Sequence, residues 1–280
     1  MKERFAHVNG NIVPVGDAVV SIADRGLIYG DGLYETIRVR NGKCVRFRRH
    51  IERLFNGARV LGFNESVFEL DFGKTIDEVL QANRLADARV RVTVTRGVST
   101  DPGKMGGAGA GEPTVVVTAD VLPEPGLEPT RVIISSLRRD EKSPLVGVKT
   151  LNCLPSVVAL AEARDQGADD AVLLNTRGKI AEGTSANVFL LLGDRLVTPS
   201  LDQGCLAGTV RAAVLELAAE LGFEAAEFVI EPDALREADE LFFTSAIKLI
   251  RPICEVAGTR VGDGTHGTCA RILEALLRAE

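Results

Sequence analysis

The segment on which the fold depends is Ser143-Pro-Leu-Val-Gly-Val-Lys-Thr-Leu-Asn-Cys-Leu154, with Lys149 near its centre. Apolar residues flank this lysine on both sides, namely Leu145, Val146, Val148 and Leu151. An ammonium group among apolar neighbours is poorly solvated, which lowers its pKa and favours a neutral, nucleophilic amine. Such an amine forms Schiff bases with carbonyl compounds. On this pattern alone, however, a lysine that reaches solvent from a buried strand is the simpler interpretation.

Length and composition indicate an ordinary globular protein with room for two modest domains. The chain has 280 residues, of which 45% are hydrophobic and 26% charged. The net charge of −6 and the pI near 5.3 argue against a nucleic-acid partner, which requires a basic patch. Apolar runs such as 186–192 are too short to span a bilayer. Residues 1–5 lack the apolar core of a signal peptide, so we expect a cytoplasmic protein without membrane partners.

The cysteines and histidines do not form a recognisable site. Five cysteines lie far apart without a Cys-x-x-Cys pair, which favours reduced thiols over a disulfide framework. Cys153 is either a reactive thiol or a small buried residue, and the second interpretation is favoured. The three histidines lack metal-ligand spacing, so we expect no metal site.

Two alternating segments in the first half of the chain predict strands that carry arginine. Residues 33–40 place Tyr34, Thr36, Arg38 and Arg40 on one face, and residues 89–96 place Arg91 among threonines. Arg91 is therefore either on a solvent-facing side or committed to an anion. Between these strands, residues 48–61 follow helical spacing, and Arg53 lies opposite the apolar stripe. The pattern alone predicts that Arg53 is exposed.

The second half of the chain begins after a proline-rich segment. Residues 121–129 contain three prolines and predict an interdomain linker between an N-terminal domain (1–120) and a C-terminal domain (130–280). Within the second domain, a helix is expected in 206–218. Gly208 and Thr209 lie at its N-terminus, where free backbone N–H groups and the helix dipole suit a phosphate.

Six motifs occur in order along almost the whole chain. They are Asp24-Arg-Gly-x-x-x-Gly-Asp-Gly-x-Tyr-Glu35, His50-x-x-Arg53, Lys149-Thr-Leu-Asn152, Glu182-Gly-Thr-Ser-Ala-Asn187, Gly208-x-x-Arg211 and Asp239-Glu-x-x-x-Thr-Ser245. Together they resemble the class IV pyridoxal-phosphate enzymes, which include branched-chain aminotransferases, D-amino-acid aminotransferases and aminodeoxychorismate lyases. The resemblance implies a mixed α+β, two-domain protein of fold type IV. Its smaller N-terminal domain is α/β, and its larger C-terminal domain is a pseudo-barrel.

The resemblance also implies how pyridoxal 5′-phosphate is bound. Lys149 would hold the cofactor covalently and then move a proton as the catalytic acid–base. Glu182 would pair with the pyridine nitrogen, and Arg53 would bind the phosphate. Val210 and Ala246 stand where family members often have threonine, which leaves more of the phosphate binding to backbone N–H groups. The full set of expected cofactor-binding residues is Arg53, Lys149, Glu182, Ser185, Asn187, Gly208, Thr209, Val210, Ser245 and Ala246.

The position of the chain within the family is intermediate. Leu154 stands where branched-chain enzymes usually have tyrosine, whereas residues 98–105 lack the Arg-x-His carboxylate trap of D-specific enzymes. Arg91 matches a pocket arginine of branched-chain enzymes, so Arg38 or Arg91 would hold the substrate carboxylate. The expected substrate-binding residues are Tyr29, Tyr34, Thr36, Arg38 and Arg91.

These expectations describe a homodimeric aminotransferase that exchanges an amino group between small amino acids and 2-oxo acids. In related enzymes the glycine-rich loop that contains Tyr29 reaches across the dimer interface. One alternative is a 4-amino-4-deoxychorismate lyase that releases pyruvate and 4-aminobenzoate. A second is a non-catalytic vitamin B6-binding protein. The presence of both Lys149 and Glu182 argues against the second alternative, because passive phosphate binding requires neither residue.

Overall fold

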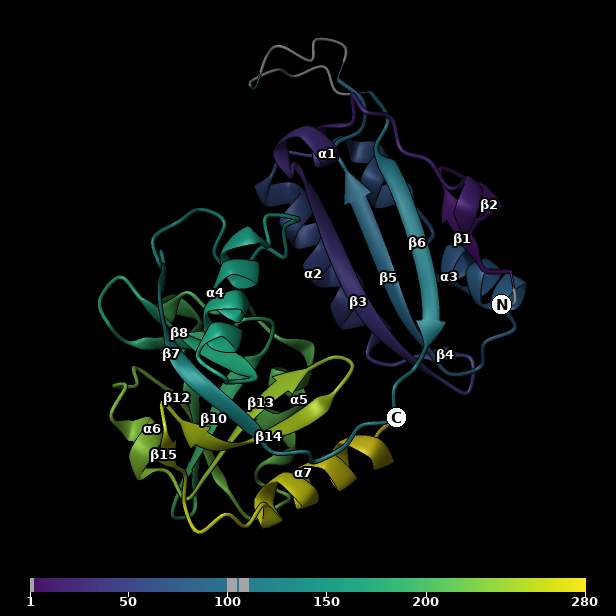
Figure 1. Cartoon of the computed structure of the whole chain (residues 1–280). Coiled ribbons are helices and arrows are strands. Elements are labelled where there is room, and N and C mark those ends of the chain that lie inside the picture. The colour runs from purple at the N-terminus through teal and green to yellow at the C-terminus, as the bar shows by residue number, and fades with distance from the viewer. Residues whose placement is uncertain (1–2, 100–104, 106–110) are drawn as a thin grey trace. The chain divides into compact units, whose positions relative to one another are not determined.

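The computed structural model describes residues 3–99, 105 and 111–280, so most of the segment 98–111 lies outside the described residues. The chain divides into two compact units. Unit 1 comprises residues 1–123 together with Val148–Asn152, and unit 2 comprises 124–147 together with Cys153–Glu280. Each unit combines helices with a β-sheet, which confirms the predicted mixed class (Figure 1). None of the helices in the described ranges is long and apolar enough to cross a membrane.

Unit 1 contains a six-stranded antiparallel sheet in the order β2-β1-β6-β5-β3-β4. Its tight turns at Asn9-Gly10 and Asn41-Gly42 have positive φ at both residues, as a two-residue hairpin requires. Each turn joins two antiparallel neighbours, β1 to β2 and β3 to β4, as an Asn-Gly sequence between two strand segments predicts. The elements of this unit are β1 (Phe5–Val8), β2 (Asn11–Pro14), η1 (Val15–Asp17), α1 (Arg25–Tyr29), β3 (Gly32–Arg40), β4 (Lys43–Cys44), α2 (Phe47–Val60), η2 (Glu65–Glu69), α3 (Phe72–Asn83), β5 (Ala88–Thr95) and β6 (Thr114–Val121).

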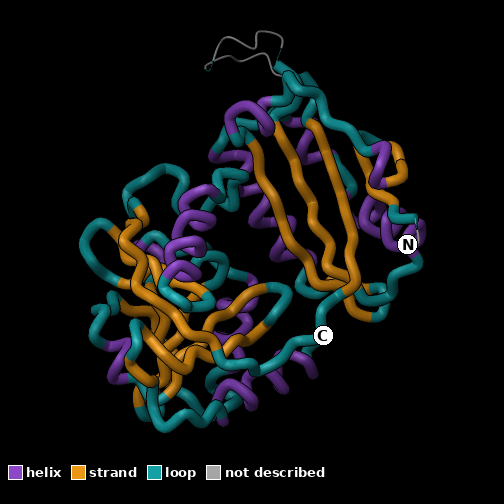
Figure 2. Tube along the Cα trace, in the orientation of Figure 1, coloured by secondary structure: helices purple, strands orange, loops and turns teal. Residues whose placement is uncertain are grey.

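The two faces of the unit 1 sheet differ in chemistry. Helices α2 and α3 cover one face of the sheet (Figures 1 and 2). This face forms a hydrophobic core with the two helices, in which Ile37 and Val92 are fully buried. Strand residues alternate between the faces, so the opposite face of β3 and β5 carries Tyr34, Thr36 and Arg91. The sheet thus presents a polar surface backed by a packed core.

The segment Val148–Asn152 groups with unit 1 because its backbone pairs with the start of β3. Tyr34 N donates to Lys149 O at 3.0 Å, and Leu151 N donates to Gly32 O at 2.9 Å. An isolated bridge joins Leu33 and Thr150. Lys149 therefore sits on a short extended segment held along β3, although its sequence position lies within the predicted 130–280 domain.

Unit 2 contains a nine-stranded mixed sheet in the order β12-β11-β10-β13-β14-β7-β8-β9, with β15 paired to β14. Strands β14, β7 and β8 are parallel neighbours, and most other pairs are antiparallel. The elements are β7 (Thr130–Arg139), α4 (Leu154–Asp165), β8 (Asp170–Asn175), β9 (Ile180–Gly183), β10 (Asn187–Leu192), β11 (Arg195–Pro199), η3 (Leu201–Gln203), α5 (Thr209–Leu217), β12 (Glu224–Phe228), α6 (Ala234–Glu237), β13 (Glu240–Ser245), β14 (Leu249–Val256), β15 (Thr259–Arg260) and α7 (Gly267–Arg278).

Candidate active site

The side chain of Lys149 lies against an aromatic ring in unit 1. Its Nζ is 4.3 Å from the centroid of the Tyr34 ring, and the guanidinium carbon of Arg91 is 3.9 Å from the same centroid. Both contacts are cation–π interactions, which attract a cation to the negative face of the ring. The structure therefore brings together three residues that the sequence assigned to the site from three separate segments.

A buried carboxylate in unit 1 binds two further site residues. Glu35 is completely inaccessible, and its carboxylate binds Arg53 at 2.7 Å through both Nε and Nη2. His50 Nδ1 lies 2.7 Å from Glu35 Oε2. Arg53 is only 11% exposed, so the exposure predicted from its helical position is wrong. The expectation failed because the partner of Arg53 is on β3, 18 residues away, and helical periodicity contains no information about it.

The protonation states in this cluster follow from its contacts. Burial opposes ionisation of Glu35, but hydrogen bonds from His50 and Arg53 outweigh it and lower the pKa of Glu35. Burial lowers the pKa of His50 despite the attraction of Glu35, and the positive charge of Lys149 adds to the lowering. A neutral His50 next to an ionised carboxylate must carry its proton on Nδ1, which leaves Nε2 as an acceptor.

The polar face of β3 and β5 holds the arginines considered for the substrate carboxylate. Arg38 is 1% exposed, whereas Arg91 is exposed and lies opposite Thr36 in the β3–β5 register. Arg89, opposite Arg38, is bound instead by Asp120 at 3.0 Å. Of the two candidates for the substrate carboxylate, Arg91 is therefore exposed and Arg38 is buried.

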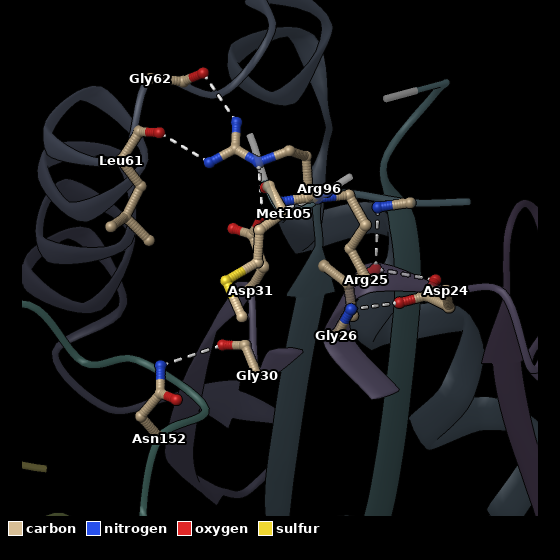
Figure 3. Close-up of polar contacts among 12 residues, drawn as sticks. Asp24, Arg25, Gly26, Gly30, Asp31, Leu61, Gly62, Arg96, Met105 and Asn152 are labelled. Carbon is tan, nitrogen blue, oxygen red and sulfur yellow. Dashed lines mark hydrogen bonds and ion pairs between the residues drawn. The ribbon is translucent and has the colours of Figure 1, made fainter. Parts of the chain in front are cut away.

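The loop with Tyr29 forms α1 and is anchored at both ends (Figure 3). Asp24 caps the helix, since its Oδ1 accepts from Gly26 N at 2.7 Å. At the other end, Asn152 Nδ2 donates to Gly30 O at 3.1 Å. Gly30 has a left-handed φ of 67°, and an added Cβ would lie 2.6 Å from Asn152 Oδ1, so this position requires glycine. The anchor joins the Tyr29 loop to the segment of Lys149.

Unit 2 holds Glu182 on β9 in a buried position. Arg139 Nη2 lies 3.0 Å from Glu182 Oε1, and Leu206 N donates to Glu182 Oε2 at 3.0 Å. Arg139 also donates to Ser156 Oγ at 3.0 Å. The sequence pattern predicts Ser156 as the N-cap of the following helix, but this prediction is wrong, because Ser156 lies inside α4. The helix begins two residues earlier, with Pro155 in its first turn, where proline is favoured because its missing N–H is not needed.

The first turn of α5 contains the residues of unit 2 at which the sequence predicts an anion site. The N-cap residue, Gly208, has no side chain with which to cap the N–H groups of Thr209 and Val210. Asn187 Nδ2 donates to Leu206 O at 2.7 Å, and its Oδ1 occupies the place that a Cβ on Gly208 would need. A helix N-terminus whose N-cap residue provides no capping side chain suits a phosphate. Of the other predicted residues, Ser185 is exposed on the turn before Asn187, and Ser245 and Ala246 are half-buried at the end of β13.

Two residues were missed by the sequence analysis. Glu35 had a signal, since it falls on the apolar face of an alternating strand, where a carboxylate requires a partner. Arg139 had none, because β7 ends in two consecutive arginines and only the folded sheet shows which one reaches Glu182.

Within the described ranges, one group combines metal-ligating side chains, namely Glu240, His266 and Cys269. Both oxygens of Glu240 already accept backbone N–H groups of α7, from Thr268 at 2.8 Å and from Cys269 at 3.1 Å. This carboxylate therefore caps the helix, and burial raises the pKa of the Cys269 thiol well above its usual range.

Comparison with known proteins identifies the family. The model of the class IV amino-transferases matches residues 32–256. The chain belongs to the class IV aminotransferases. A putative branched-chain-amino-acid aminotransferase of Methanocaldococcus jannaschii is 35% identical over 275 residues, covering 96% of this chain and 93% of the relative. A D-alanine aminotransferase of Bacillus licheniformis is 30% identical and covers 96% and 94%. An aminodeoxychorismate lyase of Bacillus subtilis is 30% identical and covers 98% and 94%.

The fold agrees with this assignment. The branched-chain amino acid aminotransferase of Escherichia coli superposes with a TM-score of 0.90 at 28% identity, covering 99% of this chain and 94% of that one. The predicted fold type IV is thereby confirmed. Class IV aminotransferases depend on pyridoxal 5′-phosphate. The residues present fit this cofactor, since the chain offers a lysine amine, a buried carboxylate in Glu182 and the N-terminus of α5, where Asn187 lies against Gly208.

Proposed function

We propose that this aminotransferase exchanges an amino group between small amino acids, branched-chain or D-amino acids, and 2-oxo acids, with Lys149 as the catalytic residue. The observation that supports this proposal most directly is the placement of the Lys149 amine against Tyr34, on the polar face of the sheet. The amine would take a proton from the substrate α-carbon and return it to the cofactor at C4′. When bound, pyridoxal phosphate supplies the electron sink for this chemistry.

In this proposal the other residues of the six motifs bind and orient the cofactor. The Glu182 carboxylate would accept a hydrogen bond from the protonated pyridine nitrogen, while Arg139 and Leu206 N hold this carboxylate in place. Arg53 binds the phosphate together with N–H groups at Thr209–Val210 and Ser245–Ala246. A guanidinium carries five N–H groups, so binding Glu35 is compatible with binding a phosphate. Gly208, Ser185 and Asn187 shape the surrounding turns.

The substrate carboxylate is assigned to Arg91 or Arg38. Arg91 is supported by its exposed guanidinium and by the adjacent Tyr34 and Thr36, which complete the polar face. Arg38 is supported only by its place on the same face, because it is buried. An arginine binds a carboxylate through two parallel hydrogen bonds, which orients the substrate as well as holding it.

We further propose a cytoplasmic homodimer in which Tyr29 contributes to the partner's substrate site. Apolar side chains around α1 are exposed, and Ile22 and Leu27 are 86% and 66% accessible. Val19, Val20 and Ile28 add to this patch. An apolar patch of this kind marks an interaction surface. A protein that sediments as a fully active monomer would contradict both the dimer and the role of Tyr29.

The lyase alternative is retained because of one specific relative, the aminodeoxychorismate lyase of Bacillus subtilis, which matches over 98% of this chain. Both activities need a lysine that carries the cofactor, so one experiment tests what they share. Borohydride reduction followed by peptide mapping is expected to find the cofactor on Lys149, and Lys149→Ala is expected to be inactive. A reduced adduct on another lysine would contradict the proposal for either reaction.

A further inference from the structure

A single carboxylate in unit 1, that of Asp31, binds two arginines, Arg25 and Arg96 (Figure 3). Asp31 Oδ2 accepts from Arg25 Nε at 2.9 Å and from Arg96 Nε at 2.8 Å. The carboxylate is 14% exposed, and the Arg25 side chain is 9% exposed. This cluster lies outside the set of residues assigned above to the cofactor and the substrate.

Each arginine of the cluster holds a different part of unit 1. The guanidinium carbon of Arg25 lies 4.9 Å from the centroid of the Tyr29 ring, and Arg25 Nη2 donates to Met105 O at 2.9 Å. Arg96 donates to Leu61 O at 2.7 Å and to Gly62 O at 2.8 Å, just beyond the C-terminus of α2. A cation at this end of a helix is favourable, because it binds carbonyls that lack partners in the helix. Of the two arginines bound by Asp31, Arg25 is therefore the one that contacts Tyr29.

The negative charge of Asp31 holds the guanidinium groups of Arg25 and Arg96 close to each other. Burial disfavours its ionised form, but hydrogen bonds from Arg96 and then from Arg25 outweigh burial and lower the pKa of Asp31. Asp31 is thus ionised at neutral pH. A neutral side chain at this position would leave two guanidinium groups facing each other, and like charges at short range repel.

We propose that Asp31 is a positioning residue, which fixes Arg25 against the Tyr29 ring and thereby sets the place of the Tyr29 hydroxyl for the substrate. The inference rests on the proposed function, which assigns Tyr29 to substrate binding. Both ends of the loop are held independently of Asp31, by Asp24 at Gly26 and by Asn152 at Gly30. Loss of the Asp31 charge therefore releases Arg25 and leaves the loop itself attached.

A double-mutant cycle on the holoenzyme tests the proposal through KM. Asp31→Asn is expected to raise KM for the amino acid roughly 5- to 20-fold with a much smaller change in kcat, since only substrate placement is affected. In a Tyr29→Phe background, which lacks the hydroxyl, the same substitution is expected to add little. Asp31→Glu is expected to restore part of the wild-type KM.

Asp120→Asn is the matched control. Asp120 also binds two arginines, Arg4 and Arg89, but on an exposed part of the sheet. Arg89 pairs with the far end of β3, whereas Tyr29 comes just before the start of that strand. Its loss is expected to leave KM unchanged. Equal effects of Asp31→Asn in the wild-type and Tyr29→Phe backgrounds would overturn the proposal, as would an unchanged KM in Asp31→Asn.

A second readout does not need turnover, because the chain has only two tyrosines and no tryptophan. In a Tyr34→Phe background, Tyr29 is the single tyrosine and can be followed by NMR with labelled tyrosine. Asp31→Asn is expected to shift or broaden its ring signals, whereas Asp120→Asn is expected to leave them unchanged. Unaltered signals in Asp31→Asn would overturn the positioning role even if the enzyme had no transaminase activity, so the two failures are distinguishable.

Discussion

The amine nitrogen of Lys149 lies 4.3 Å from the centroid of the Tyr34 ring. Arg91 contacts the same ring at 3.9 Å, so one aromatic side chain holds two cations that unit 1 brings from different segments. Since like charges repel, this arrangement depends on the negative face of the ring. Tyr34 therefore orients the candidate catalytic amine and the candidate carboxylate ligand together.

Substitution of Tyr34 tests this orientation. Tyr34→Leu removes the ring and is expected to lower kcat/KM roughly two- to thirtyfold, which corresponds to a cation–π interaction of about 0.5–2 kcal/mol. Tyr34→Phe keeps the ring and is expected to retain most of the activity. Steady-state kinetics on both variants give the comparison. Equal losses in the two variants would assign the effect to the hydroxyl instead.

Glu35→Gln is expected to destabilise unit 1. The substitution leaves Arg53 and His50 without their buried carboxylate, and removing one partner of a buried ion pair costs about 3–5 kcal/mol. Denaturant unfolding at neutral pH measures the change. Glu52→Gln is the control, because Glu52 pairs with Arg48 on the surface of α2, the helix that carries both partners of Glu35. Surface pairs of this kind contribute about 0–1 kcal/mol.

The same cluster predicts a pH dependence of stability. The pKa of His50 is below its ordinary value of 6.5 and that of Glu35 is below 4.5, so the unfolded chain binds protons more readily at both residues. Their contributions are present above those ordinary values and are lost as the pH falls through the folded-state pKa values. The free energy of unfolding is thus expected to decrease below pH 6.5 and further below pH 4.5. In Glu35→Gln the decrease below pH 4.5 should be smaller.

Local sequence patterns predicted many elements of the fold and fewer of its contacts. The turns at Asn9-Gly10 and Asn41-Gly42, the helix α2 and the strand β5 follow from turn chemistry and periodicity. Strand β14 was missed because Pro252 interrupts its pattern, although the pairing of Pro252 with Phe242 keeps it in the sheet.

The sequence predicted those features of the site that depend only on neighbouring residues in the chain. The N-terminus of α5 could be read from Gly208 and Thr209, since a helix dipole is a local property. The burial of Arg53 could not, because it depends on Glu35, and the link between Glu182 and Arg139 spans more than one strand. Pairings of this kind are fixed by tertiary structure and leave no periodic signal.

The role of Arg91 is tested against that of Arg38. If Arg91 binds the substrate carboxylate, Arg91→Lys is expected to raise KM for both the amino acid and the 2-oxo acid about tenfold or more. A lysine retains the charge but loses the two parallel hydrogen bonds of the guanidinium. Arg89→Lys is the matched control from the same strand, because Arg89 is bound by Asp120. Wild-type KM in Arg91→Lys, with a raised KM in Arg38→Lys, would transfer the role to Arg38.

The reaction type is the last prediction. A transaminase binds two substrates in turn at one site, so a single carboxylate ligand must serve both half-reactions, and the accessible Arg91 fits this requirement. A lyase must instead accept one large cyclic dicarboxylate, for which Arg38 and Arg40 on the same face would add positive charge. We expect simple amino acids to convert the bound cofactor to pyridoxamine phosphate, with a change in its absorption spectrum, and 2-oxoglutarate or pyruvate to reverse the change. Lys149→Ala serves as the control and should show neither conversion. Formation of pyruvate and 4-aminobenzoate from aminodeoxychorismate, without a pyridoxamine form from any amino acid of either hand, would identify the chain as a lyase instead.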